Sequence, residues 1–88
     1  MDLKITVTAK DIQNGKTSQA SFCPIALACH RLGYPGATVT HDYIRFNFDL
    51  DETSVPKKMT DWVAKFDAGE VVKPFSFTVK NAPKPRSL

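Results

Sequence analysis

The sequence predicts an α+β domain of the ferredoxin-like kind, a βαββαβ chain in which two helices cover one face of a four-stranded antiparallel sheet. Three observations predict it. Segments with strand and helix periodicity follow in the order β-α-β-β-α-β, both helical segments carry apolar stripes, and the chain of 88 residues fits one domain. We expect residues 1–79 to form this domain and residues 80–88 to be a flexible basic tail that contains proline.

The first half of the chain holds one predicted strand and one predicted helix. Residues 3–7 alternate between apolar and polar side chains, as a strand with one buried face does. Residues 10–19 are mostly polar and are predicted to form a loop, in which residues 11–14 can form one helical turn. The helix that follows is capped by Ser21 or Cys23 and stopped by Gly33.

The second half supplies the other three strands and the second helix. In order, we expect a hairpin of residues 37–40 and 43–50, a polar loop over 49–54 that ends in the N-cap Ser54, a helix that ends at Gly69, and a strand over 75–79. The apolar positions of these elements predict the core, and Leu32, Trp62, Phe66 and Phe75 are among its expected members.

Charge and hydropathy set limits on the function. The net charge is +3, but basic and acidic residues balance up to Val79, so the excess lies in Lys80, Lys84 and Arg86. The predicted domain therefore lacks the net positive charge that phosphate-backbone binding favours. No apolar run is long enough to span a membrane, so we expect no membrane partner, a cytoplasmic protein and two reduced cysteines.

Two stretches resemble a family of small proteins encoded by bacteriophages and prophages. They are SFCPIALA (21–28), shortly after ITVTAKDIQNG (5–15), and FDAGEVVKPFSF (66–77). The resemblance implies a phage-type origin, a role outside housekeeping metabolism and action in the host cytoplasm. It carries over no catalytic residue. Phage proteins of this size often bind and block, which favours a counter-defence (anti-CRISPR-like) inhibitor.

The first helix is the candidate contact surface for a partner. Its apolar stripe leaves Leu27, His30 and Arg31 on the outer side, where an apolar residue on a small monomer tends to mark an interface. The hypothesis is a non-enzymatic protein that contacts a host protein there, or a second copy of itself. In the alternative, the polar loop folds back over Leu27 and covers it.

Two further binding functions stay open. A phosphate or nucleotide signal can bind at the start of the first helix, where Lys16, Ser18, Ser21 and Cys23 surround the free backbone amides. Such a protein would act as a nucleotide sponge.

The second alternative is nucleic-acid binding through the open face of the sheet. It would use Lys4 on the first strand and Tyr43 and Arg45 on the third. This function is disfavoured, because one aromatic ring and one arginine make a poor stacking platform.

Enzyme activity, metal binding and a cofactor are not expected. Cys23 at a helix start can have a lowered pKa, but His30 is about two helical turns away and cannot act as its base. The cysteines and histidines match no zinc-ligand spacing, and the glycines form no phosphate-binding loop.

Overall fold

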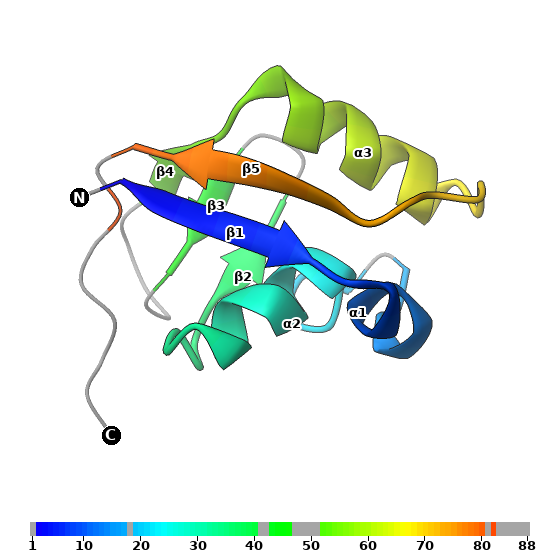
Figure 1. Ribbon diagram of the computed structural model, residues 1–88, viewed down its shortest axis with the longest axis horizontal. Coiled ribbons are helices and arrows are strands. Elements are labelled where there is room, and N and C mark those ends of the chain that lie inside the picture. The colour runs from blue at the N-terminus through cyan, green and yellow to red at the C-terminus, as the bar shows by residue number, and fades with distance from the viewer. Residues whose placement is uncertain (1, 18, 41–42, 47–51, 81, 83–88) are drawn as a thin grey trace.

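The computed structural model describes residues 2–17, 19–40, 43–46, 52–80 and 82. These residues form β1 (Leu3–Val7), α1 (Ala9–Asn14), α2 (Pro24–Arg31), β2 (Thr38–Val39), β3 (Tyr43–Arg45), β4 (Glu52–Ser54), α3 (Lys57–Asp67) and β5 (Phe75–Val79). In Figure 1, α2 and α3 lie on opposite sides of the molecule with β1 and β5 between them. The predicted α+β class with antiparallel strands is confirmed.

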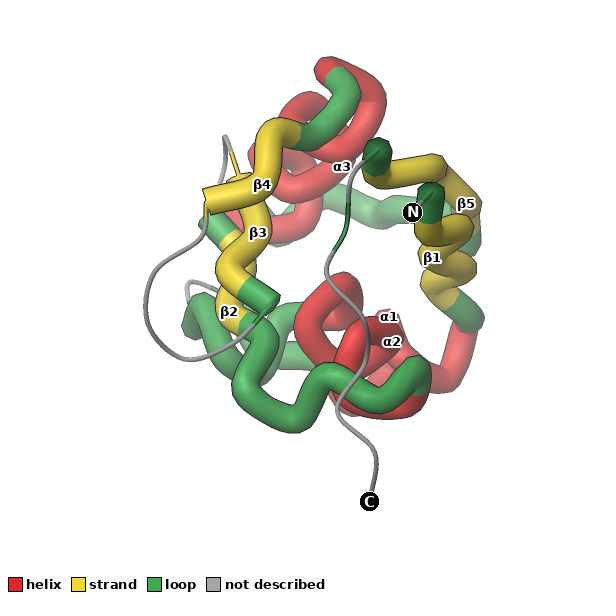
Figure 2. Tube along the Cα trace, turned by 90° about the vertical axis from the view of Figure 1, so that its left-hand side faces the viewer, coloured by secondary structure: helices red, strands yellow, loops and turns green. Residues whose placement is uncertain are grey.

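The described strands form two antiparallel sheets. β1 pairs with β5 along its whole length, with Leu3 opposite Val79 and Val7 opposite Phe75. β3 pairs with β2 on one edge and with β4 on the other. Figure 2 shows these sheets on opposite sides of the molecule, with α3 at one end and α1 and α2 at the other.

The single four-stranded sheet that the sequence predicted is not formed by the described strands. That arrangement needs the third predicted strand to pair with the first. In the structure, β4 occupies that edge of β3, with Ser54 opposite Tyr43 and Glu52 opposite Arg45. The prediction of a polar loop over residues 49–54 is therefore wrong for 52–54, and residues 47–51 lie outside the described part. β4 is an edge strand of polar residues, in which Glu52 and Ser54 are exposed and Thr53 is half-buried, and hydropathy does not reveal such a strand.

The two longer helices end where the sequence predicted, but α3 begins later. Gly33 and Gly69 follow α2 and α3 with φ of 103° and 81°, the left-handed conformation that terminates a helix. The predicted N-cap Ser54 lies in β4, and the N-cap of α3 is Pro56. Proline disfavours helical backbone at the residue before it, so Val55 cannot belong to the helix.

The core lies between the two sheets and the helices. Its largest fully buried side chains are Tyr34, Phe46, Ile5, Ile25, Ile44 and Met59. Tyr34 packs against Phe46 with ring centroids 4.7 Å apart. Five expected core residues are not fully buried: Leu32 is 37% exposed, and Leu3, Trp62, Phe66 and Phe75 are half-buried.

Beyond the predicted domain boundary at Val79, the structure describes Lys80 and Ala82. Ala82 is buried and belongs to the core cluster, so the packed chain reaches beyond Val79. A side chain as small as alanine gives no strong hydropathy signal among the polar residues around it. Residues 81 and 83–88 of the predicted flexible tail lie outside the described part of the chain.

Candidate functional site

The start of α2 is capped by Cys23. Its Sγ accepts a hydrogen bond from the backbone N–H of Ala26 at 3.4 Å, and Pro24 occupies the first helical position, where its missing N–H costs nothing. Of the two caps that the sequence allowed, the cysteine is therefore the one used. Both Cys23 and Cys29 are free thiols and both are buried.

The predicted anion site at this helix start is closed by the chain itself. Cys23, Pro24, Ile25 and Ala26 are all buried. The Pro24 ring lies so close to Gly15 that a Cβ there would be 2.5 Å from the ring carbons. The helix amides therefore do not face open solvent, as an anion would require.

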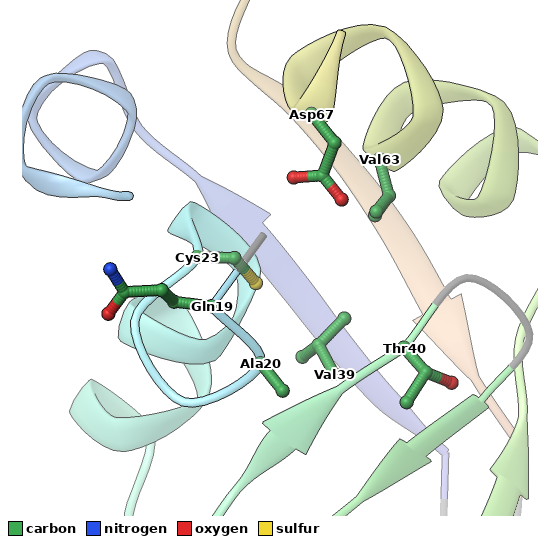
Figure 3. A pocket seen from close by; sticks show the side chains of 7 residues that line it. All are labelled: Gln19, Ala20, Cys23, Val39, Thr40, Val63 and Asp67. Carbon is green, nitrogen blue, oxygen red and sulfur yellow. The ribbon is translucent and has the colours of Figure 1, made fainter. Parts of the chain in front are cut away.

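The other residues of that prediction do not form an anion cradle. Lys16 is exposed and Ser21 is half-buried, and Ser18 lies outside the described residues. The hollow beside Cys23 has a volume of about 250 Å³ and is lined by Gln19, Ala20, Cys23, Val39, Thr40, Val63 and Asp67. In Figure 3 the Asp67 carboxylate lies above the Cys23 sulfur. A carboxylate in this hollow disfavours phosphate, so nucleotide binding stays a prediction that the geometry does not favour.

Neither thiol has the environment of a nucleophile. Burial raises the pKa of Cys23 above its ordinary value, and the nearby charge of Asp67 raises it further, against the hydrogen bond from Ala26. Burial also raises the pKa of Cys29 to about 12. The dipole of α2 does not overcome this desolvation, since a thiolate at Cys23 would be largely out of water.

Both thiols are expected to react slowly with Ellman's reagent at neutral pH and at once in denaturant. Cys23→Ser should fold with a stability within about 1 kcal/mol of the natural protein, because serine is a good N-cap. The measurement is the rate of thionitrobenzoate release from the native protein and from Cys23→Ser. A fast native phase that disappears in the serine variant would contradict the buried cap and show a reactive thiol.

The predicted contact residue Arg31 uses its guanidinium for hydrogen bonds within the protein. Its guanidinium donates to both carboxylate oxygens of Asp11, at 2.7 and 3.0 Å, and to the backbone carbonyl of Thr6 at 3.0 Å. Asp11 also accepts from the backbone N–H of Thr8, which completes the capping box of α1. Arg31 thus ties the end of α2 to β1 and α1.

Leu27 and His30 lie on the remaining outer side of α2. Leu27 is half-buried. The segment predicted as a polar loop contains α1, which packs against α2. The His30 Nε2 lies 3.2 Å from the backbone carbonyl of Ala37 and donates to it. The predicted outer side of α2 is therefore partly covered, and Leu27 alone offers too small an apolar area for an interface.

The most exposed aromatic ring near α2 is Phe22, which the sequence analysis did not single out. Its side chain is 53% exposed. Its backbone is held at both ends: the N–H donates to the carbonyl of Gln19 at 3.0 Å, and the carbonyl accepts from Lys16 at 2.8 Å. Phe22 and Leu27 occupy the N′ and N4 positions of α2, the pair that forms a hydrophobic staple. That spacing is the signal that could have found Phe22.

A shallow hollow adjoins Phe22. Its volume is about 200 Å³, and it is lined by Ser21, Phe22, His30, Pro35, Gly36, Ala37 and Thr38. We use the name Phe22 surface for Phe22, Leu27, His30 and the turn 35–37. It combines two predicted contact residues, Leu27, which is half-buried, and His30, which is hydrogen-bonded, with the exposed ring of Phe22.

The predicted nucleic-acid face is not assembled. Lys4 lies in β1, whereas Tyr43 and Arg45 lie in β3, which belongs to the other sheet. Arg45 lies over the Tyr43 ring, 5.3 Å from its centroid, and pairs with Glu52 at 2.9 Å. The three residues were placed on one face because the sequence predicted one sheet.

The described residues contain no group of three or more histidine, cysteine, aspartate or glutamate side chains that could hold a metal ion. In the same part of the chain, every helix is too short or too polar to cross a bilayer. Comparisons of the chain with protein-family models, with curated proteins and with solved structures found no match.

Proposed function

We propose that the protein is a non-enzymatic accessory protein of phage type, which acts in the host cytoplasm by binding and blocking a host protein through the Phe22 surface. The single observation that carries the proposal is the exposed ring of Phe22 on a fixed backbone. The phage-type origin rests on the sequence resemblance and stays a prediction.

An exposed aromatic side chain on a fixed backbone has the properties of an interface anchor. Aromatic residues are enriched among the few residues that carry most of the binding energy of a protein interface. Because hydrogen bonds hold Phe22 at both its N–H and its carbonyl, less conformational entropy is lost when a partner covers the ring. The adjoining hollow offers a place for a side chain of the partner.

Blocking, rather than chemistry, is the mechanism that this surface supports. The polar side chains that line its hollow are Ser21, His30 and Thr38, and His30 is hydrogen-bonded to the carbonyl of Ala37. A partner held there would lose access to whatever it normally binds at the same place. Protein contact, not a reactive group, is what we expect to produce the effect.

The change Phe22→Asp is expected to abolish capture of the host protein and to leave the fold intact, because the side chain is mostly in solvent. The measurement is affinity capture from host lysate with the natural protein, with Phe22→Asp and with Val71→Asp as the matched control. Val71 is 97% exposed and does not line the hollow beside Phe22, so Val71→Asp should still capture the partner. A charge inside an interface costs about 2 kcal/mol or more, roughly a thirtyfold loss of affinity.

Circular-dichroism melting of both variants provides the folding control. A partner that is captured equally well by Phe22→Asp, or no partner captured at stoichiometric yield by the natural protein, would contradict the proposal. Leu27→Asp offers a second test. It should lose the same partner, although its half-buried position means that some stability is lost as well.

A further inference from the structure

The two-stranded sheet of β1 and β5 has two outer edges, and the two edges differ. At the outer edge of β1, the Arg31 guanidinium donates to the backbone carbonyl of Thr6 at 3.0 Å. At its outer edge, β5 pairs with no other strand of the described chain. In Figures 1 and 2, β5 is the strand nearer to α3 and β1 is the strand nearer to α2. The open edge of this sheet is therefore the edge of β5.

The pairing of the two strands shows which backbone groups point to the open edge. Because the Thr6 carbonyl accepts from Arg31, it points away from β5, and Thr6 and its partner Ser76 are a non-hydrogen-bonded pair. Their hydroxyl oxygens lie 3.1 Å apart, in agreement with the close side chains of such a pair. Two residues along, Lys4 and Thr78 form the next pair of this kind. The N–H and C=O groups of Ser76 and Thr78 therefore point away from β1.

These outward backbone groups have no hydrogen-bond partner among the described residues. Thr78 is exposed and Ser76 is half-buried. The outer edge of β2 differs, because the Val39 N–H donates to the carbonyl of Ala20 at 3.0 Å. The outer edge of β4 belongs to a strand of 3 residues that begins with the charged Glu52. An open edge of uncharged residues, such as that of β5, is a template for another strand.

Half-buried aromatic rings lie on one face of the same edge. Side chains alternate along a strand, so Phe75 lies on the face opposite to Ser76. Trp62 of α3 stacks on Phe75 with ring centroids 4.8 Å apart and planes inclined by 17°, and both rings are half-buried. The Trp62 Nε1 donates to the backbone carbonyl of Lys73 at 2.9 Å, which fixes the indole. A strand added to β5 would place every second side chain on the face of these rings.

From these observations we propose that the open edge of β5 binds an extended segment of a partner protein, which joins the sheet as a third strand. The backbone of the segment would pair with the outward groups of Ser76 and Thr78. Its side chains would alternate between apolar residues on the face of Phe75 and Trp62 and polar residues on the other face. This site goes beyond the proposed function, because neither Phe22 nor any residue that lines the adjoining hollow belongs to β5 or α3.

A segment of a partner fits this edge better than a second copy of the chain does. The β5 strand of a second copy carries its own α3, since Trp62 stacks on Phe75, so two α3 helices would have to share one face of the joined sheet. Antiparallel pairing centred on Phe77 would also place Lys73 of each copy next to Lys80 of the other. Like charges at such positions are destabilising, and lysines at a strand edge oppose self-pairing. A single extended segment brings neither a helix nor these lysines.

Two synthetic peptides in which threonine and valine alternate provide the test. In a strand added to β5, the threonines share the face of Ser76 and Thr78 and direct their N–H groups to β5, whereas the valines direct theirs away. The first peptide is N-methylated at the valines, which keeps the pairing with β5 and stops growth of the peptide into larger sheets. The second peptide is N-methylated at the threonines and lacks the required donors. We expect saturable binding of the first peptide and binding of the second that is weaker by about tenfold or more.

Amide hydrogen exchange resolved by residue is the direct readout. In the free protein, the N–H groups of Ser76 and Thr78 should exchange faster than those of Phe77 and Val79, which bond to β1. The first peptide, at about ten times its dissociation constant, should slow the exchange of Ser76 and Thr78 about tenfold. Trp62 is the only tryptophan of the protein, and its fluorescence emission should shift in the same titration.

Thr78→Pro tests the edge from the side of the protein. Proline lacks the outward N–H and is tolerated in an edge strand where that N–H faces solvent, so β1 and β5 should stay paired. The first peptide should bind this variant about tenfold more weakly, whereas Thr78→Ala keeps the N–H and should bind it within about twofold of the natural affinity. Circular-dichroism melting checks the fold of both variants. If Thr78→Pro unfolds, the comparison of the two peptides on the natural protein still decides.

Three results would overturn the inference. One is the absence of binding by the first peptide, or equal binding of the two peptides. The second is binding that leaves the exchange of Ser76 and Thr78 unchanged. The third is protection of these N–H groups in the free protein that rises with protein concentration, because a second copy would then occupy the edge. Phe22→Asp should keep full peptide affinity, so failure here and failure of the proposed function are separate results.

Discussion

Replacement of Gly15 by alanine is expected to destabilise the protein by about 2–3 kcal/mol. The added Cβ would lie 2.5 Å from Cδ and Cγ of Pro24 and 2.7 Å from its backbone nitrogen. Neither a proline ring nor the backbone at the start of a helix can move aside as a flexible side chain would. Gly15 itself has φ of −73°, which any residue adopts, so the cost is steric and not conformational.

Gly69→Ala is the matched control for this prediction. A Cβ at Gly69 meets nothing within 4 Å, but its φ is +81°, so the cost is conformational and is expected to be about 1 kcal/mol. Urea unfolding of both variants gives the comparison. A loss of unfolding free energy in Gly15→Ala that is no larger than in Gly69→Ala would show that the Pro24 contact is loose.

Asp11→Asn is expected to lower the unfolding free energy at neutral pH by about 2 kcal/mol, because the buried carboxylate accepts from both Arg31 and Thr8. Asparagine keeps the shape but loses the charge and one acceptor. The expected loss of unfolding free energy is smaller than for a fully buried ion pair, since the Arg31 side chain is half exposed to water.

The same carboxylate makes the stability depend on pH. Burial on its own would raise the pKa of Asp11, but the hydrogen bonds from Arg31 and Thr8 outweigh it and lower the pKa below its ordinary value. A lowered pKa in the folded state stabilises the protein above the pKa of the unfolded chain, about 4. This contribution is lost as the pH falls from there through the lower folded-state pKa.

Urea unfolding at a series of pH values checks both parts of this prediction. The natural protein should lose more stability between about pH 5 and pH 2 than Asp11→Asn does. Glu52→Gln breaks the exposed Arg45–Glu52 pair and should change stability far less than Asp11→Asn at every pH. If the two variants had equal effects, the Asp11–Arg31 pair would be no stronger than an ordinary surface pair.

Local signals in the sequence were enough to predict β1, α2, α3 and β5. Alternation, an apolar stripe and a glycine stop are each contained within a few neighbouring residues, and Gly33 and Gly69 end their helices as predicted. The partition into two sheets depends instead on β4, whose side chains are polar and, except for Thr53, exposed. Hydropathy cannot distinguish such an edge strand from a loop. The predicted sheet, in which the third strand pairs with the first, was therefore wrong.

The candidate site could be predicted only in part, for a related reason. The region around α2 was identified from its apolar outer side, but the packing of α1 against α2 and the pairing of Arg31 with Asp11 were not predicted. Both arise when distant segments fold together. Thr8 and Asp11 do form a readable capping box, which would have extended the helical turn predicted for residues 11–14 to a helix over 9–14.

The pairing of β1 with β5 has a consequence for the order of folding. Its partners, such as Leu3 and Val79, come from the two ends of the packed chain, so this ladder closes the longest loop that the domain contains. Contacts of such high sequence separation slow folding. During synthesis, β1 therefore stays without its strand partner until β5 has left the ribosome, and a truncated chain that lacks β5 would expose the edge of β1 to association with other chains.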